Sequence, residues 1–291
     1  MTILHPDQFE VGVTDVRRLL RAQFPEFADL PISPVVSSGT VNAVFRLGDD
    51  MLARLPFVLW GSADIEHEAR WLPTIGTSLP VPIPRFVGLG VPDDDYPCAW
   101  SILSWMPGAP VEVETTLPGL TADLAGFVVA MRSIDVAGAP ACYRGGPLAP
   151  LDLDVRRCLV ESAQLVDVAR LTAIWEDCLD APSWTGDPVW AHGDLLPGNV
   201  LVDDGRLVAV IDFACAGIGD PACDLLAAWS IVPDAELDAF RDAVGMDDAT
   251  WRRGRGWSLS QAIIALPYYL DTNPVMASNS LRILERLCAV G

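Results

Sequence analysis

Three side chains between residues 192 and 212 have the types and spacing that phosphoryl transfer requires. Residues 192–199 read His-Gly-Asp-Leu-Leu-Pro-Gly-Asn, and Asp212 follows in the sequence Ile-Asp-Phe. Moving a phosphoryl group to a hydroxyl needs a carboxylate beside the hydroxyl and oxygen ligands for Mg²⁺. Asp194 can supply the carboxylate, and Asn199 and Asp212 can supply the ligands.

Short strands on both sides of this segment are expected to position the three side chains. The expected elements are strands at 190–191, 200–202 and 207–211, with a hairpin turn at 203–205. This hairpin should return Asp212 to the level of Asn199, with Asp194 across the loop. Asp, Gly and Asn are also common in simple turns, so a turn without chemistry is the alternative. A simple turn, however, requires neither His192 nor a second Asp one hairpin later.

The pattern His-Gly-Asp-x-x-x-x-Asn followed by Ile-Asp resembles the catalytic segment of the aminoglycoside phosphotransferase family. Members of that family are relatives of protein kinases and phosphorylate antibiotics and other small molecules. The resemblance implies that Asp194 is the catalytic base, that Asn199 and Asp212 bind Mg²⁺, and that His192 supports the loop. It also implies an α+β, two-lobed protein-kinase-like fold, with an N-terminal antiparallel sheet and one main helix before a mostly helical C-terminal lobe.

The chain contains no lysine, although kinase-like enzymes usually hold the nucleotide phosphates with a strand lysine paired to a helix glutamate. Arg54, in an expected strand over 49–56, lies where the family's order of elements places that lysine. An arginine offers a planar fork of donors that suits phosphate oxygens. Glu68 is the expected partner, on a helix from Ser62, its expected N-cap, to about residue 75. Because Arg and Glu are ordinarily exposed, two surface residues are the alternative.

Two more segments are expected to contact the nucleotide, which could be ATP or GTP. Residues 35–47 indicate a hairpin whose tip could present Ser37 and Ser38 to phosphates, or could be only a tight turn. The resemblance further implies that the backbone from Ser104 to Met106 bonds the purine edge, with Leu103 behind it. Neither a P-loop nor a dinucleotide-binding glycine pattern occurs, which excludes those nucleotide folds.

A change from short strands to long helical patterns after Pro107-Gly108 marks the expected boundary between lobes. Residues 1–105 should form the nucleotide-binding lobe and residues 106–291 the catalytic and substrate-binding lobe. Apolar residues at three-to-four spacing predict helices at 121–134, 154–179, 221–231, 235–244, 249–270 and 277–289. Asp220 is the expected N-cap before Pro221, and the resemblance implies that Asp224 supports the catalytic loop.

The phosphate acceptor is expected to be a small molecule. Only seven residues separate Asp212 from Asp220, which is too short for the activation segment that holds a peptide in protein kinases. An aminoglycoside is the first candidate; a macrolide, a nucleoside antibiotic or a small metabolite are alternatives, as is a nucleotide-binding scaffold without activity. A hydrolase with a Ser-His-Asp arrangement is a further alternative, and two features argue against it: Gly-x-Ser-x-Gly is absent and the chain has only three histidines.

The composition excludes several other classes. A net charge of −20 argues against a nucleic-acid partner. Residues 106–291 carry 26 acids and 12 arginines, which would attract a cationic antibiotic or merely keep the protein soluble. No apolar run reaches the roughly 18 residues of a membrane span, so a cytoplasmic location is expected. Seven cysteines without Cys-x-x-Cys spacing predict neither a disulfide framework nor a zinc site.

Overall fold

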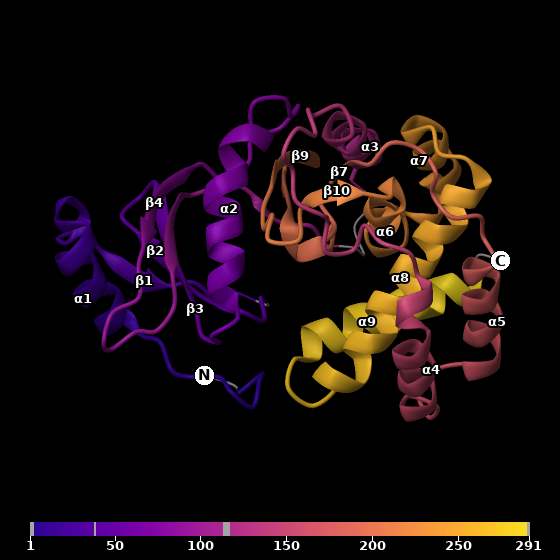
Figure 1. Cartoon of the computed structure of the whole chain (residues 1–291), viewed down its shortest axis with the longest axis horizontal. Coiled ribbons are helices and arrows are strands. Elements are labelled where there is room, and N and C mark those ends of the chain that lie inside the picture. The colour runs from indigo at the N-terminus through magenta and orange to yellow at the C-terminus, as the bar shows by residue number, and fades with distance from the viewer. Residues whose placement is uncertain (1–2, 38, 113–116, 290–291) are drawn as a thin grey trace. The chain divides into compact units, whose positions relative to one another are not determined.

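The computed structural model describes residues 3–37, 39–112 and 117–289 (Figure 1). Its internal contacts divide the chain into two compact units. The first unit comprises residues 1–77, 82–107 and 209–214, and the second comprises 78–81, 108–208 and 215–291. The segment 209–214, which carries Asp212, therefore packs with the N-terminal unit although the sequence around it belongs to the other.

The first unit is built on an antiparallel sheet of five strands in the order β1-β2-β3-β5-β4. The strands are β1 (Ile32–Pro34), β2 (Asn42–Leu47), β3 (Met51–Pro56), β4 (Phe86–Gly90) and β5 (Trp100–Ser104). On the central strand β3, Arg54 lies opposite Val44 of β2 and Ser101 of β5. The expected hairpin is present, because β1 pairs antiparallel with β2, but its first strand lies at Ile32–Pro34, earlier than expected; the amide of Val35 still donates to the carbonyl of Val44 at 2.8 Å.

Two helices accompany the sheet in this unit, α1 (Val13–Gln23) and α2 (Gly61–Ile75), with a short 3₁₀ turn (Pro25–Phe27) after α1. Apolar side chains of α1, including Leu19 and Leu20, are buried in one core with Phe45 and Trp100 of the strands. Helix α2 packs against β4 and β5. Ser62 is not its N-cap: the cap position is Trp60, and the Ser62 hydroxyl instead accepts a hydrogen bond from the amide of Ala99 at 2.8 Å.

The second unit is mostly helical, which with the sheet confirms the expected α+β class. Its helices are α3 (Leu120–Met131), α4 (Asp152–Glu161), α5 (Val168–Leu179), α6 (Leu226–Ser230), α7 (Leu237–Val244), α8 (Asp248–Tyr269) and α9 (Pro274–Ala289). Its 3₁₀ turns are Ala149–Leu151, Pro197–Asn199, Pro221–Leu225 and Asp234–Glu236. Helix α8 lies at the centre and contacts α4, α5, α6 and α9. Among the described residues, none of the helices combines the length and apolar character needed to cross a bilayer.

The single helix expected over 154–179 is wrong, because the chain forms α4 and α5 with a break between them. Asp167 starts α5 by accepting a hydrogen bond from the amide of Arg170 at 3.0 Å. A capping carboxylate satisfies a backbone donor that would otherwise lack a partner, so it favours a new helix start over continuation.

Asp220 caps the 3₁₀ turn Pro221–Leu225, as expected, and accepts a hydrogen bond from the amide of Ala222 at 3.0 Å. It also forms an ion pair with the buried Arg253.

Short strands flank the segment 192–199, and all of their residues except 209 and 210 belong to the second unit. They are β6 (Ala109–Pro110), β7 (Val189–Ala191), β8 (Val200–Asp203), β9 (Arg206–Val210) and β10 (Gly217–Gly219). The turn between β8 and β9 has positive φ at Asp204 (46°) and Gly205 (78°), as a tight two-residue hairpin turn requires. Strand β10 pairs antiparallel with β7, an interaction that the sequence pattern did not predict.

Candidate active site

The loop that begins at His192 is held in place by buried hydrogen bonds. The His192 side chain is fully buried, and its Nδ1 accepts a hydrogen bond from the amide of Asp194 at 3.1 Å. The buried carboxylate of Asp224 accepts from the amides of His192 and Gly193, at 2.9 and 2.7 Å. Gly193 has φ 75°, and a side chain there would meet the Cys142 sulfur at 2.9 Å. The backbone before Asp194 is therefore held by the His192 ring, by the Asp224 carboxylate and by close packing around Gly193.

Burial raises the pKa of the Asp224 carboxyl, whereas His192 and the two backbone amides oppose that rise. The hydrogen bonds therefore favour the carboxylate in a setting that would otherwise disfavour its charge.

The side chains of Asp194 and Asn199 are bonded to each other. Asn199 Nδ2 donates to the carbonyl oxygen and to Oδ2 of Asp194, both at 2.9 Å. Because the amide nitrogen is used in this way, Asn199 Oδ1 is the end that remains for a cation. The Asp194 side chain is 20% exposed, so a small molecule can reach its carboxylate.

Arg144 and Gln261 also contact Asp194, and the sequence analysis missed both. Arg144 Nη1 donates to Asp194 Oδ1 at 3.0 Å and to the carbonyl of Gly193 at 2.8 Å. Gln261 Nε2, on α8, donates to the same Oδ1 at 2.7 Å. Burial disfavours the Arg144 cation, but Asp194 together with Cys215, Tyr143 and Cys142 outweighs this effect, so the Arg144 pKa is raised. These two donors fix the rotamer of Asp194 and occupy Oδ1.

A second cluster, in the first unit, joins Arg54, Glu68 and Asp212. Arg54 Nη2 forms an ion pair with Glu68 Oε2, and Nη1 lies 3.4 Å from Glu68 Oε1 and 3.8 Å from Asp212 Oδ1. Glu68 Oε1 also accepts from the amide of Phe213 at 2.8 Å. Arg54 and Glu68 are 7% and 1% exposed, which excludes the alternative of two surface residues. The Asp212 side chain is 40% exposed and leaves oxygen atoms for a ligand.

Asp64, beside this cluster, should make the free energy of unfolding depend on pH. It lies one helical turn before Glu68 on α2, and burial, followed by the negative charge of Asp212, raises its pKa to about 6, with Arg54 opposing. The folded protein then keeps a proton that the unfolded chain has lost, so the free energy of unfolding should fall as pH rises from about 4 to about 6. Asp64→Asn should raise that free energy by roughly 1–2 kcal/mol above pH 6 and leave it unchanged below about pH 4.

Urea unfolding of both proteins at about pH 4 and about pH 7, in Mg²⁺-free buffer, measures this effect. Parallel pH dependences of the variant and the wild type would contradict the assignment of the proton to Asp64.

The other residues expected at the nucleotide lie in the first unit. Ser37 is exposed, and its hydroxyl accepts from the amide of Gly39 at 3.0 Å, as in a tight turn; Ser38 lies outside the described residues. Leu103 is buried at the end of β5. The Ser104 hydroxyl accepts from the amide of Arg85 at 2.8 Å.

In the segment from Ser104 to Met106, two amides are already used. The Ser104 amide donates to the carbonyl of Arg85 at 2.9 Å, and the Trp105 amide donates to the carbonyl of Asp50 at 2.7 Å. Within the described part of the chain, the amide of Met106 makes no such bond.

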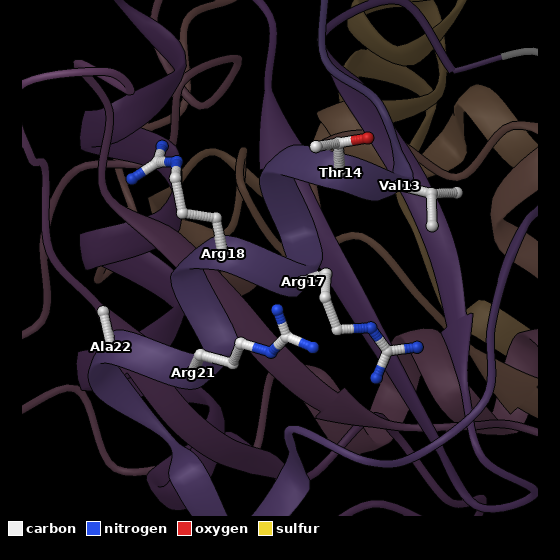
Figure 2. Close-up of a pocket in the computed structure, with 6 residues that line it drawn as sticks. All are labelled: Val13, Thr14, Arg17, Arg18, Arg21 and Ala22. Carbon is white, nitrogen blue, oxygen red and sulfur yellow. The ribbon is translucent and has the colours of Figure 1, made fainter.

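A hollow of about 560 Å³ on α1 contains none of the expected site residues. Figure 2 shows its lining, in which Arg17, Arg18 and Arg21 project from the helix. Arg17 donates to the carbonyl of Leu30 at 2.9 Å, and Arg18 forms an ion pair with Asp93. Two of the three arginines therefore hold α1 against other parts of its unit.

Solved structures of antibiotic phosphotransferases have the same fold as this chain. Aminoglycoside 2'-phosphotransferase-IIIa in complex with GDP superposes with a TM-score of 0.76 at 20% identity, covering 96% of this chain and 99% of that chain. A macrolide 2'-phosphotransferase from Brachybacterium faecium gives a TM-score of 0.62 at 21% identity, covering 92% of this chain and 98% of that chain. The fold is therefore the kinase-like fold of these enzymes.

The sequence assigns the family as well. Residues 34–257 match the profile of the phosphotransferase enzyme family (APH), and the chain belongs to this family. An aminoglycoside 3'-phosphotransferase of Streptomyces fradiae is 28% identical over 189 residues, which are 59% of this chain and 64% of the relative. A second one, of Escherichia coli, is 26% identical over 57% of this chain and 63% of the relative. The matches thus span less than two thirds of these relatives.

Proposed function

We propose that this chain transfers the γ-phosphoryl group of ATP or GTP to a hydroxyl of a small molecule. The observation that carries the proposal is the environment of Asp194, a partly exposed carboxylate whose Oδ1 accepts from Arg144 and Gln261. Oδ1 accepts from two donors and Oδ2 only from Asn199 Nδ2, so Oδ2 keeps a lone pair that can orient an acceptor hydroxyl and take its proton. A carboxylate fixed in this way suits general base catalysis, because its geometry is set before the acceptor binds.

The cluster around Arg54 supports nucleotide binding. Arg54 is buried between Glu68 and Asp212, where a cation can contact phosphate oxygens without losing its partner carboxylate. We propose that Ser37, which is exposed, and Ser38, which follows it in the sequence, also contact phosphates. We further propose that the amide of Met106 bonds the purine edge beside Leu103. Adenine and guanine each carry an acceptor that this single amide could bond, so both ATP and GTP stay candidates for the donor nucleotide.

The proposed Mg²⁺ ligands fit a metal held jointly with a nucleotide. Among the described residues, no group of three or more His, Cys, Asp or Glu could hold a metal ion. Mg²⁺ at phosphoryl-transfer sites needs only one or two protein oxygens, because phosphates and water complete its shell. Asn199 Oδ1 and the exposed Asp212 carboxylate would supply them. When bound there, Mg²⁺ neutralises the charge that develops on the phosphates.

For the acceptor, we propose a cationic antibiotic, with an aminoglycoside first. The curated relatives are aminoglycoside 3'-phosphotransferases, and the acidic excess of residues 106–291 favours ammonium groups. A macrolide is the second candidate because a macrolide phosphotransferase shares the fold. We also propose a cytoplasmic location, where nucleoside triphosphates are available.

The test is a screen for nucleotide-dependent phosphate incorporation into aminoglycosides, macrolides, nucleoside antibiotics and small alcohols, with ATP and with GTP. Incorporation into at least one class, abolished when EDTA removes Mg²⁺, is the expected result. Nucleotide hydrolysis without an acceptor, with and without Mg²⁺, is measured in parallel. A wild-type protein that binds nucleotide but modifies no acceptor and hydrolyses nothing would be a scaffold and would refute the proposal.

A further inference from the structure

One end of the Gln261 carboxamide is bonded to Asp194, and the other end has no hydrogen-bond partner among the described residues. Its Nε2 donates to Asp194 Oδ1 at 2.7 Å. A carboxylate only accepts hydrogen bonds, so this contact fixes which end of the carboxamide is nitrogen. Gln261 Oε1 must therefore point away from Asp194 Oδ1. Its orientation as a hydrogen-bond acceptor is thus set by Asp194, the proposed base.

Gln261 Oε1 is buried and has no hydrogen-bond partner among the residues that the structure describes. A buried acceptor without a partner costs about 1–3 kcal/mol, and native structures contain few of them. The residue as a whole is only partly buried, and the terminal torsion of a glutamine side chain is soft. A small rotation could therefore present Oε1 to a bound molecule while Nε2 stays near Asp194.

Gln261 and Arg144 differ in their place in the sequence and in their chemistry. It lies on α8, beyond the family match that ends at residue 257. Arg144, the other donor to Asp194 Oδ1, lies within that match. An arginine side chain only donates hydrogen bonds, whereas a glutamine side chain also accepts them. Of these two residues, only Gln261 can therefore accept a hydrogen bond from the molecule that receives the phosphate.

We propose that Gln261 Oε1 accepts a hydrogen bond from a hydroxyl or amino group that neighbours the phosphorylated hydroxyl. The preferred acceptor then contains a vicinal diol or amino alcohol. This inference rests on the proposed function, because it assumes that Asp194 Oδ2 receives the reacting hydroxyl. Since both heteroatoms of a carboxamide are attached to one carbon, the donor and the reacting hydroxyl must be close together on the acceptor.

The test compares Gln261→Leu with the wild type on two acceptors. One is the best acceptor from the screen, and the other is its analogue with hydrogen in place of the neighbouring hydroxyl or amino group. For the wild type, we expect kcat/KM to fall about 10- to 100-fold on the analogue, because a buried polar group is then left unpaired. For Gln261→Leu, we expect the ratio of kcat/KM on the two acceptors to approach one, with the KM for nucleotide unchanged.

The proposal would be overturned if the ratio of kcat/KM on the two acceptors were the same in both proteins. It would also be overturned if the wild type did not discriminate between the acceptors and Gln261→Leu lost activity equally on both. Gln164→Leu, an exposed change of the same kind, is the matched control and should behave as the wild type. If the wild type phosphorylates nothing, the proposed function fails, and calorimetry with 2-deoxystreptamine and nucleotide still tests Gln261. Equal affinity of both proteins for this amino alcohol would then refute its role.

Discussion

Replacing Asp194 with asparagine should lower kcat for phosphoryl transfer about 10²- to 10⁴-fold, the usual contribution of a positioned general base. The nucleotide dissociation constant should stay nearly unchanged, because the residues proposed to hold phosphates and purine belong to the first unit. Asp194→Ala should abolish transfer, since it also removes the acceptor of the bonds from Arg144 and Gln261. Steady-state transfer and nucleotide titration by calorimetry provide the two measurements.

The control for this experiment is Asp203→Asn, which removes the same charge from an exposed residue of β8 in the same unit. It should retain wild-type kcat. Equal turnover by Asp194→Asn and the wild type would remove Asp194 from the mechanism, whatever the acceptor.

Replacing Arg54 with methionine should weaken nucleotide binding and destabilise the protein. Hydrogen bonds to charged groups contribute about 1.5–3 kcal/mol, so the nucleotide dissociation constant should rise about 10- to 100-fold. The change also leaves the carboxylate of Glu68, which is 1% exposed, without its cation. Losing one partner of a buried ion pair costs about 3–5 kcal/mol, which urea unfolding would detect.

A double variant separates the two effects. In Arg54→Met/Glu68→Gln, the buried negative charge is gone, so stability should recover in part while nucleotide binding stays weak. Arg54→Lys keeps a cation but loses the planar fork, and should bind nucleotide with an intermediate affinity. Unchanged nucleotide affinity in Arg54→Met would show that another residue holds the phosphates.

The local parts of the fold were predictable from the sequence, and the places where prediction failed have identifiable causes. The β8–β9 hairpin follows from Asp204-Gly205, which tolerate the positive φ of the turn. The strand of Arg54 and the helix of Glu68 likewise follow from local patterns. The expected helix over 154–179 failed because the chain leaves the helix after Glu161 and starts a new one at the Asp167 cap, a break that apolar spacing alone does not reveal. The expected cap at Ser62 failed because its hydroxyl bonds Ala99 of a neighbouring segment.

By itself, the sequence determined the residue types of the site, because a short loop and one hairpin carry Asp194, Asn199 and Asp212. Only the tertiary structure decided what surrounds them. Arg144 and Gln261 lie 50 and 67 residues from Asp194, and neither belongs to a periodic pattern or motif that points to it. Their positions depend on how α8 and the segment before α4 pack, and such packing is set by the whole core of a unit, which local spacing does not encode.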